Sequence, residues 1–173
     1  MSAASTFRRG RLEPALVPWS ISLSDTWLTV TCGEEQEPIV HLLAEFLPDQ
    51  HTERVRIEFS GGGWVLLSPH DGREALPPDE YDWSGVPGQL QPGERRTQWA
   101  TRVRQLWEQT GHHPRPDMYI VHDSEWAKSL RAERFGLTHF VFAGHDVRLD
   151  ILARDFRWIS EGPRSYGEAG EGD

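Results

Sequence analysis

The stretch THFVFAGHDVRLDILA, residues 138–153, contributes most to the fold prediction because it has the pattern of a complete β-hairpin. Two apolar, β-branched runs at 138–143 and 147–153 flank a Gly-His-Asp turn at 144–146. Strands joined by so short a turn pair antiparallel. We therefore expect an antiparallel sheet, with residues 156–159 extending it or re-entering it.

Two further hairpins are expected nearer the N-terminus. Residues 19–23 and 26–32 alternate apolar and polar side chains around a Ser-Asp turn. Residues 54–59 alternate in the same way, and three successive glycines separate them from the apolar run 64–67. Glycine favours tight turns because it adopts positive φ angles easily. Both pairs are therefore predicted to fold as antiparallel hairpins.

Three segments have helical spacing. Residues 37–46 begin with Glu-Pro and place apolar side chains at intervals of 3, 4 and 7. Residues 94–110 have an apolar stripe that includes two tryptophans, and Gly111 follows as a stop signal. Residues 123–133 begin with an aspartate that can cap a helix. These segments are predicted to be helices, and residues 118–121 are predicted to form a short strand.

Together these elements predict an α+β fold in the order ββαββ, loop, αβαββ. It would have a mainly antiparallel, curved sheet of about seven strands, with three helices on one face. Residues 15–162 would form a single domain with a long loop at 69–93, because Pro and Gly are concentrated there. Residues 1–14 are expected to be a flexible segment and residues 163–173 an acidic, disordered tail.

The composition of the 173 residues predicts the cellular compartment of the protein. A single cysteine, Cys32, allows neither an intramolecular disulfide nor a cysteine-based metal site within one chain. No apolar run approaches the roughly 20 residues of a spanning helix, and no secretory signal pattern follows Met1. Arginine outnumbers lysine 17 to 1, which is typical of a GC-rich bacterial coding sequence. We expect a cytoplasmic bacterial protein that does not contact membranes.

The net charge of −9 is unevenly distributed. Residues 13–94 hold 15 acidic side chains against 3 arginines, a difference of −12. Such a surface repels the phosphate backbone, which supplies much of the affinity of nucleic-acid-binding proteins. The charge therefore argues against nucleic acid as a ligand and favours encounter with a basic partner.

Motifs of known chemistry are missing. The three glycines at 61–63 precede a strand and have no lysine nearby, so they do not form a phosphate-binding loop. Neither the Gly-x-Ser-x-Gly pattern of a nucleophile elbow nor the His-Glu-x-x-His pattern of a zinc helix occurs. We assign no catalytic residue, no metal ligand and no cofactor from motifs, which favours a protein that is not an enzyme.

Three histidines follow or flank predicted strands. His122, His139 and His145 would converge if their strands were neighbours, and Asp123 or Asp146 would then complete a metal or acid–base site. The alternative is that each is a surface or half-buried residue with its own hydrogen bonds. We favour the alternative because no register information links the strands.

One segment of the long loop combines acids with large aromatics: Asp79, Glu80, Tyr81, Asp82 and Trp83. Aromatic side chains supply binding energy at interfaces, and acids steer a basic partner. We predict these five residues as a partner-binding site. Equally, the two aromatics would anchor the loop to the domain's own core while the acids face water.

The leading functional prediction is an acidic cytoplasmic protein-binding domain of inhibitor, immunity or adaptor type that engages a basic protein surface. The first alternative is a small-molecule-binding or catalytic α+β domain. Its pocket would lie between sheet and helices and be lined by aromatics, with His122 and His139 as acid–base groups. A second alternative is a structural subunit of a phage or secretion-type assembly. The oligomeric state is left open.

Overall fold

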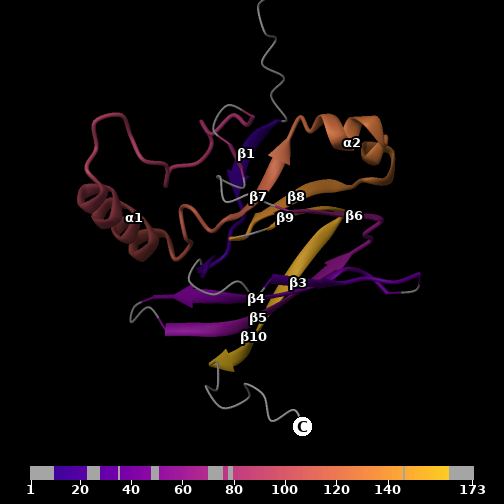
Figure 1. Cartoon of the computed structure of the whole chain (residues 1–173), viewed down its shortest axis with the longest axis horizontal. Coiled ribbons are helices and arrows are strands. Elements are labelled where there is room, and N and C mark those ends of the chain that lie inside the picture. Colours follow the sequence, from indigo (N-terminus) through magenta and orange to yellow (C-terminus); the bar gives the residue numbers. More distant parts are fainter. Residues whose placement is uncertain are drawn as a thin grey trace, which may run out of the picture.

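The computed structural model describes residues 10–22, 28–34, 36–47, 51–69, 76–77, 80–145 and 147–163. Within them, ten strands form two antiparallel sheets (Figure 1). The first sheet has the order β1 (Arg11–Pro14), β7 (Met118–His122), β8 (Thr138–Ala143), β9 (Val147–Ala153) and β6 (Trp64–Pro69). The second has the order β10 (Asp155–Pro163), β5 (His51–Ser60), β4 (Ile39–Phe46) and β2 (Trp19–Ile21), and β3 (Leu28–Thr31) also pairs with β4.

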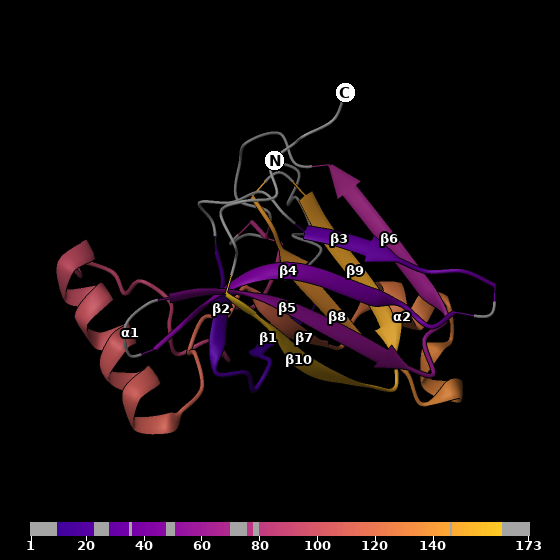
Figure 2. The ribbon, with the colours of Figure 1, turned by 90° about the horizontal axis from the view of Figure 1, so that it is seen from below.

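The two sheets pack against each other around one apolar core. Strands of the first sheet cross obliquely over those of the second (Figure 2). Phe59 of β5 meets Phe140 and Phe142 of β8, with ring centroids 5.3 Å and 6.1 Å apart. Alternating side chains of both sheets fill the space between them. The fold is thus α+β and mainly antiparallel, as expected, but it has two facing sheets and more strands than the seven predicted.

The hairpin predicted from residues 138–153 is confirmed. Strands β8 and β9 pair antiparallel from Thr138 opposite Ala153 to Ala143 opposite Arg148. Strand β7 confirms the strand predicted at 118–121. The predicted strand at 156–159 lies within β10, which pairs with β5 in the second sheet. The chain therefore leaves the first sheet at the end of β9 and enters the second.

The hairpin predicted from residues 54–59 and 64–67 is wrong. Strand β5 pairs with β4 and β10, whereas β6 pairs with β9 in the other sheet. The three glycines between them form a corner instead of a hairpin turn. Gly61 has φ +61°, and a Cβ on Gly62 would lie 2.8 Å from Pro38. This tight corner allows the chain to cross from one sheet to the other.

The hairpin predicted from residues 19–23 and 26–32 is also wrong. Strands β2 and β3 pair with successive parts of the same edge of β4, β2 near its C-terminal end and β3 near its N-terminal end. Residues 23–27 lie outside the described part of the chain. The long strand β4 offers enough hydrogen-bonding edge for both short strands, so they need not pair with each other.

The helix predicted at 37–46 is strand β4. Its apolar spacing of 3, 4 and 7 also contains an alternation, because Val40, Leu42 and Ala44 are all buried in the core between the sheets. Pairing on both sides, with β5 and with β2 and β3, uses the backbone hydrogen-bonding groups of β4. Long-range pairing therefore outweighs the local helical pattern.

Two α-helices, α1 (Arg96–Thr110) and α2 (Glu125–Ser129), and one 3-10 helix, η1 (Ala132–Phe135), occur within the described residues. In both overall views α1 and α2 lie at opposite ends of the sandwich (Figures 1 and 2). Helix α1 ends at Gly111 with φ +71°, as predicted. No helix among the described residues is long and apolar enough to cross a membrane.

The helix predicted at 123–133 is shorter than expected and begins differently. Ser124, not Asp123, caps α2, because its hydroxyl accepts a hydrogen bond from the Ala127 N–H. Asp123 has a positive φ of +56° and lies outside the helix. Arg131, with φ +53°, separates α2 from η1. The predicted helix is therefore two short pieces.

A second, smaller core covers the outer face of the first sheet. Tyr81 and Val86 of the long loop pack on Tyr119 of β7 and Val141 of β8. Residues 11–14, assigned to the flexible N-terminal segment, form β1, and the Leu12 N–H donates to the Asp82 carbonyl. Leu76, Tyr81 and Val86 thus pack the predicted loop on the sheet.

Candidate functional site

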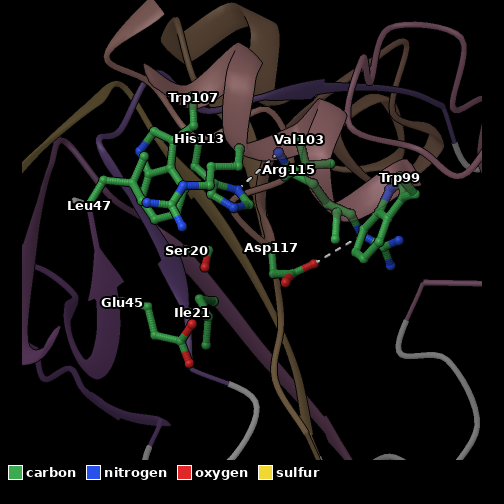
Figure 3. A pocket seen from close by; sticks show the side chains of 12 residues that line it. Ser20, Ile21, Glu45, Leu47, Trp99, Val103, Trp107, His113, Arg115 and Asp117 are labelled. Carbon is green, nitrogen blue, oxygen red and sulfur yellow. Dashed lines mark hydrogen bonds and ion pairs between the residues drawn. The ribbon is translucent and has the colours of Figure 1, made fainter. Parts of the chain in front are cut away.

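A cavity of about 570 Å³ lies between α1 and the adjoining ends of the two sheets (Figure 3). Strands β2 and β4, helix α1 and the connection that precedes β7 contribute its walls. The lining residues are Ser20, Ile21, Glu45, Leu47, Trp99, Ala100, Val103, Arg104, Trp107, His113, Arg115 and Asp117. We call this cavity the α1 pocket.

Two tryptophans of α1 fix the helix to the loops beneath it. Trp107 Nε1–H donates to the Pro18 carbonyl at 2.9 Å, and Trp99 Nε1–H donates to the Gly88 carbonyl at 2.7 Å. Since both indole N–H groups are used within the protein, the rings present carbon surface to the pocket. The tryptophan stripe predicted on residues 94–110 therefore both packs the helix and lines a cavity.

An ion pair clamps the start of α1 to the preceding loop. Arg102 donates from Nε and Nη2 to the two Glu94 carboxylate oxygens, each at 2.8 Å. It also donates to the Pro87 and Gln89 carbonyls at 2.7 Å and 2.8 Å. The hydrogen bonds that Glu94 accepts from Arg102 and from the Gln91 N–H lower its pKa to about 2. The clamp sets the position of the helix that forms the outer wall of the pocket.

Asp117 supplies a buried carboxyl group to the pocket. It has a positive φ of +59°, and its backbone carbonyl accepts from the Ala143 N–H at 2.8 Å. Tyr119 donates its hydroxyl to Asp117 Oδ1 at 3.3 Å, and Arg115 Nε lies 3.6 Å from the same oxygen. Burial raises the pKa of Asp117 to about 6, against the smaller opposing effects of Arg115 and Tyr119. At pH 7 the group is mainly a carboxylate.

His113 lines the same pocket in its neutral form. Its Nδ1 accepts from the Arg115 N–H at 3.1 Å, so the proton of the neutral ring is on Nε2. The ring meets Trp107 edge to face, with centroids 4.3 Å apart. Burial lowers the pKa of His113 to about 4, because the charged form loses its hydration. The imidazole therefore adds no positive charge at neutral pH.

Glu45 supplies a second carboxylate from β4. Its Oε1 accepts from the Ser22 hydroxyl at 3.2 Å. Figure 3 shows Ser20, Ile21, Glu45 and Asp117 on the side of the cavity that faces away from α1. The pocket thus has an aromatic wall on one side and two carboxylates on the other, and the side chains of Arg104 and Arg115 also line it.

Of the five predicted partner-binding residues, the four that the structure describes do not line this pocket. Asp79 falls outside the described residues. Tyr81 is buried, with 2% of its surface exposed, in the second core. The Trp83 ring lies edge to face with Tyr119, 5.6 Å away, and the Arg115 guanidinium lies 5.6 Å from the Trp83 ring centroid. The two aromatics point inward, as in the anchoring alternative, while Glu80 and Asp82 are half-buried.

The three predicted histidines have separate environments. His139 is buried and its ring nitrogens contact Ser124 and Asp150. His122 contacts Glu13 across the β1–β7 pair, and His145 is exposed in the β8–β9 turn. Asp146 is outside the described residues. Among the residues that are described, no group of three or more His, Cys, Asp or Glu is arranged to hold a metal ion.

Sequence reasoning missed the polar residues of the α1 pocket. Glu45 was expected on a helix, and His113 lies between the helix predicted at 94–110 and the strand predicted at 118–121. The available signal was the pair of tryptophans on one helix face followed by Arg115-Pro116-Asp117 just before a strand. That signal is weak, because nothing local shows that β2 and β4 approach the same place.

The chain matches no protein-family model, no curated protein and no solved structure. The chemistry of the α1 pocket is therefore the basis for a functional conclusion.

Proposed function

We propose that this domain binds a small organic cation with an apolar body in the α1 pocket. The observation that carries the proposal is the arrangement in Figure 3, where indole rings face two carboxylates across one cavity. The volume, about 570 Å³, falls within the range of roughly 300 to 1,000 Å³ usual for ligand pockets.

The lining carries the carboxylates of Glu45 and Asp117 and the guanidinium groups of Arg104 and Arg115. Arg104 pairs with Glu108, and Arg115 pairs with Asp117. Glu45 has a neutral hydroxyl, that of Ser22, as its hydrogen-bond donor, so its negative charge is not balanced by that contact. The Asp117 carboxylate forms an ion pair with Arg115, and the guanidinium of Arg115 also lies over the Trp83 ring. His113 is neutral because its pKa is lowered to about 4. A ligand ammonium or amidinium group beside Glu45 would gain a charge-assisted hydrogen bond.

The opposite wall favours an apolar or aromatic body. Trp99, Val103 and Trp107 present carbon surface, and both indole N–H groups are already used. Tryptophan faces attract cations through their quadrupole and pack well against flat ligands. A cationic aromatic molecule would satisfy both walls at once.

The net charge of −9 supports this proposal as well as it supports a basic protein partner, because an acidic surface attracts cations of either kind. The binding of a basic protein by residues 79–83 stays a prediction. We favour the small cation because the α1 pocket supplies both a shaped volume and charged groups. The loop aromatics Tyr81 and Trp83, by contrast, pack against the domain itself.

Calorimetric titration of the full chain tests the proposal. Tryptamine is the cationic probe, and indole-3-acetate is its anionic counterpart. We expect tryptamine to bind, and Glu45→Gln to weaken it by about tenfold or more, since a charge-assisted contact is lost. Glu133→Gln, an exposed acid on η1 at the other end of the sandwich, removes the same charge and should leave binding unchanged.

Binding of indole-3-acetate as tight as that of tryptamine would overturn the proposal. Equal tryptamine affinity in the wild type and in Glu45→Gln would overturn it too. A loss of affinity in Glu133→Gln as large as in Glu45→Gln would show a general charge effect instead of a site.

A further inference from the structure

A second polar cluster lies at the α2 end of the sandwich, away from the α1 pocket. Ser124 Oγ and His139 Nδ1 are 2.7 Å apart, and His139 Nε2 and Asp150 Oδ1 are 2.9 Å apart. All three residues are 3 to 5% exposed. We call Ser124, His139 and Asp150 the α2 relay.

The proton positions in the α2 relay follow from its outer partners. Arg148 Nε donates to Asp150 Oδ2 at 2.9 Å, which favours the ionised carboxylate. A carboxylate only accepts, so His139 Nε2 donates to Asp150, and in the neutral ring Nδ1 carries the lone pair. Ser124 Oγ accepts from the Ala127 N–H at 3.1 Å and has its own proton left to donate to His139 Nδ1.

The fold explains how these residues meet. The register of β8 and β9 places Val141 opposite Asp150 and His139 opposite Leu152, so His139 and Asp150 share the outer face of the first sheet. Ser124 enters from a different element, at the sharp turn where β7 gives way to α2 after Asp123. The rings of Trp126 and His139 meet edge to face, with centroids 5.0 Å apart. Helix α2 therefore packs over the histidine.

The α2 relay borders its own cavity of about 240 Å³. Leu66 of β6, Tyr81 of the loop and Trp126 of α2 provide apolar or aromatic walls. The polar residues Ser124, Glu125, His139, Arg148 and Asp150 also line it. A serine hydroxyl aligned with an imidazole base beside a small apolar cavity is the arrangement that nucleophilic acyl transfer requires.

We propose that Ser124 is the nucleophile of an acyl-transfer site that hydrolyses esters with small acyl groups. His139 is the general base, and Asp150 is a positioning residue that holds the imidazole in the tautomer with a free Nδ1. This inference goes beyond the proposed cation binding and is independent of it, because no residue lines both cavities.

The reaction has two balanced stages. First, Ser124 Oγ attacks the ester carbonyl carbon while His139 Nδ1 takes the hydroxyl proton, and the guanidinium of Arg148 provides positive charge in the cavity. The bond from carbon to the alcohol oxygen then breaks, and the imidazolium returns its proton to the leaving alcohol. In the second stage water, activated by the same imidazole, attacks the acyl-serine and releases a carboxylic acid and free Ser124.

The first experiment uses diisopropyl fluorophosphate, a small reagent that phosphorylates activated serines with loss of fluoride. We expect one covalent adduct on the full chain, located at Ser124 by peptide mass spectrometry. His139→Gln should slow labelling by about 100-fold or more, because general-base catalysis contributes at least that much. Ser129→Ala, an exposed serine of the same helix, should label at the wild-type rate.

Two variants separate catalysis from folding. Ser124→Thr keeps a hydroxyl that can cap α2 and contact His139, and its added methyl group should block attack, so labelling falls while the circular dichroism spectrum is retained. Hydrolysis of p-nitrophenyl acetate should fall in parallel in Ser124→Thr and His139→Gln. The absence of labelling in folded wild-type protein would overturn the proposal. Labelling at another serine, or an unchanged rate in His139→Gln, would overturn it too.

Discussion

The α1 pocket and the α2 relay are each built around one histidine and one aspartate, but their hydrogen bonding differs. In the α2 relay each ring nitrogen of His139 has a side-chain partner, and both Asp150 oxygens accept. In the α1 pocket Asp117 Oδ1 accepts a hydrogen bond from the Tyr119 hydroxyl at 3.3 Å, and Arg115 Nε lies 3.6 Å from the same oxygen. His113 Nδ1 accepts a hydrogen bond from the backbone N–H of Arg115.

This difference shows two ways of burying polar groups. Where burial is incompletely compensated, the pKa values of the groups move: Asp117 rises to about 6 and His113 falls to about 4. The α2 relay instead completes its own hydrogen bonds, so its members form a unit with a fixed direction of proton donation.

The largest expected effect comes from breaking the α2 relay. Asp150→Ala removes the acceptor for both Arg148 and His139, and leaves a half-buried guanidinium without its carboxylate. We expect the free energy of unfolding to fall by about 3 to 5 kcal/mol, the usual effect of removing one partner of a buried ion pair. Guanidinium chloride unfolding at pH 7 measures it.

Glu45→Ala is the matched change in the α1 pocket. Its carboxylate is half-buried and contacts a hydroxyl, so the expected loss is about 1 kcal/mol or less. Equal losses in the two variants would contradict the contrast drawn between the two clusters.

The next effect concerns the pH dependence of the α1 pocket. The Asp117 pKa is raised from 3.8 to about 6, so the folded state holds more protons between these values and stability falls as pH rises through them. The His113 pKa is lowered from 6.5 to about 4, so the unfolded state holds more protons and stability rises with pH over that window. In the wild type the two contributions largely offset each other.

Single variants should reveal each slope. Asp117→Asn keeps an acceptor for Tyr119 and should leave a protein whose stability increases from pH 4 to 6.5. His113→Asn keeps an acceptor for the Arg115 N–H and should leave one whose stability decreases from pH 4 to 6. Each change is on the order of 2 to 3 kcal/mol, measured by denaturant unfolding across this range. Parallel pH curves for the two variants would contradict this account.

The same contrast explains what the sequence could predict. The β8–β9 hairpin depends on local alternation and a three-residue turn, and its register alone puts His139 and Asp150 on one face. Helix α1 likewise depends on a local stripe and on Gly111. Both were predictable because the decisive interactions lie within one continuous segment.

The wrong predictions concern elements whose pairing partners lie far away in the sequence. Strand β4 has a helical spacing, and only its pairing with β2, β3 and β5 decides against a helix. The corner at Gly61 joins two sheets, which local turn signals cannot distinguish from a hairpin. The α1 pocket and Ser124 were missed for the same reason, because each site draws residues from elements separated in sequence.

A smaller effect tests whether the two ends act independently. Gly111 after α1 and Gly136 after η1 have φ +71° and +66°, and a Cβ at either would meet nothing within 4 Å. Alanine at either position should therefore lower the free energy of unfolding by about 1 kcal/mol through backbone strain alone.

The same two variants test whether the ends of the sandwich are coupled. Gly111→Ala should weaken tryptamine binding without changing the labelling of Ser124, and Gly136→Ala should not change the affinity for tryptamine. An effect of Gly136→Ala on tryptamine affinity would show that the ends are coupled.

The smallest effect compares two ion pairs of equal length. Arg104 Nε and Glu108 Oε1 on α1 are 2.9 Å apart, as are Arg148 Nε and Asp150 Oδ2, but the α1 side chains are 53% and 49% exposed, against 15% and 5%. Water screens the exposed pair, so Glu108→Ala should lower the free energy of unfolding by less than about 0.5 kcal/mol at pH 7. Repeating the measurement in 1 M sodium chloride should remove even that difference. A loss comparable with that of Asp150→Ala would mean that contact distance, not burial, sets the energy of these pairs.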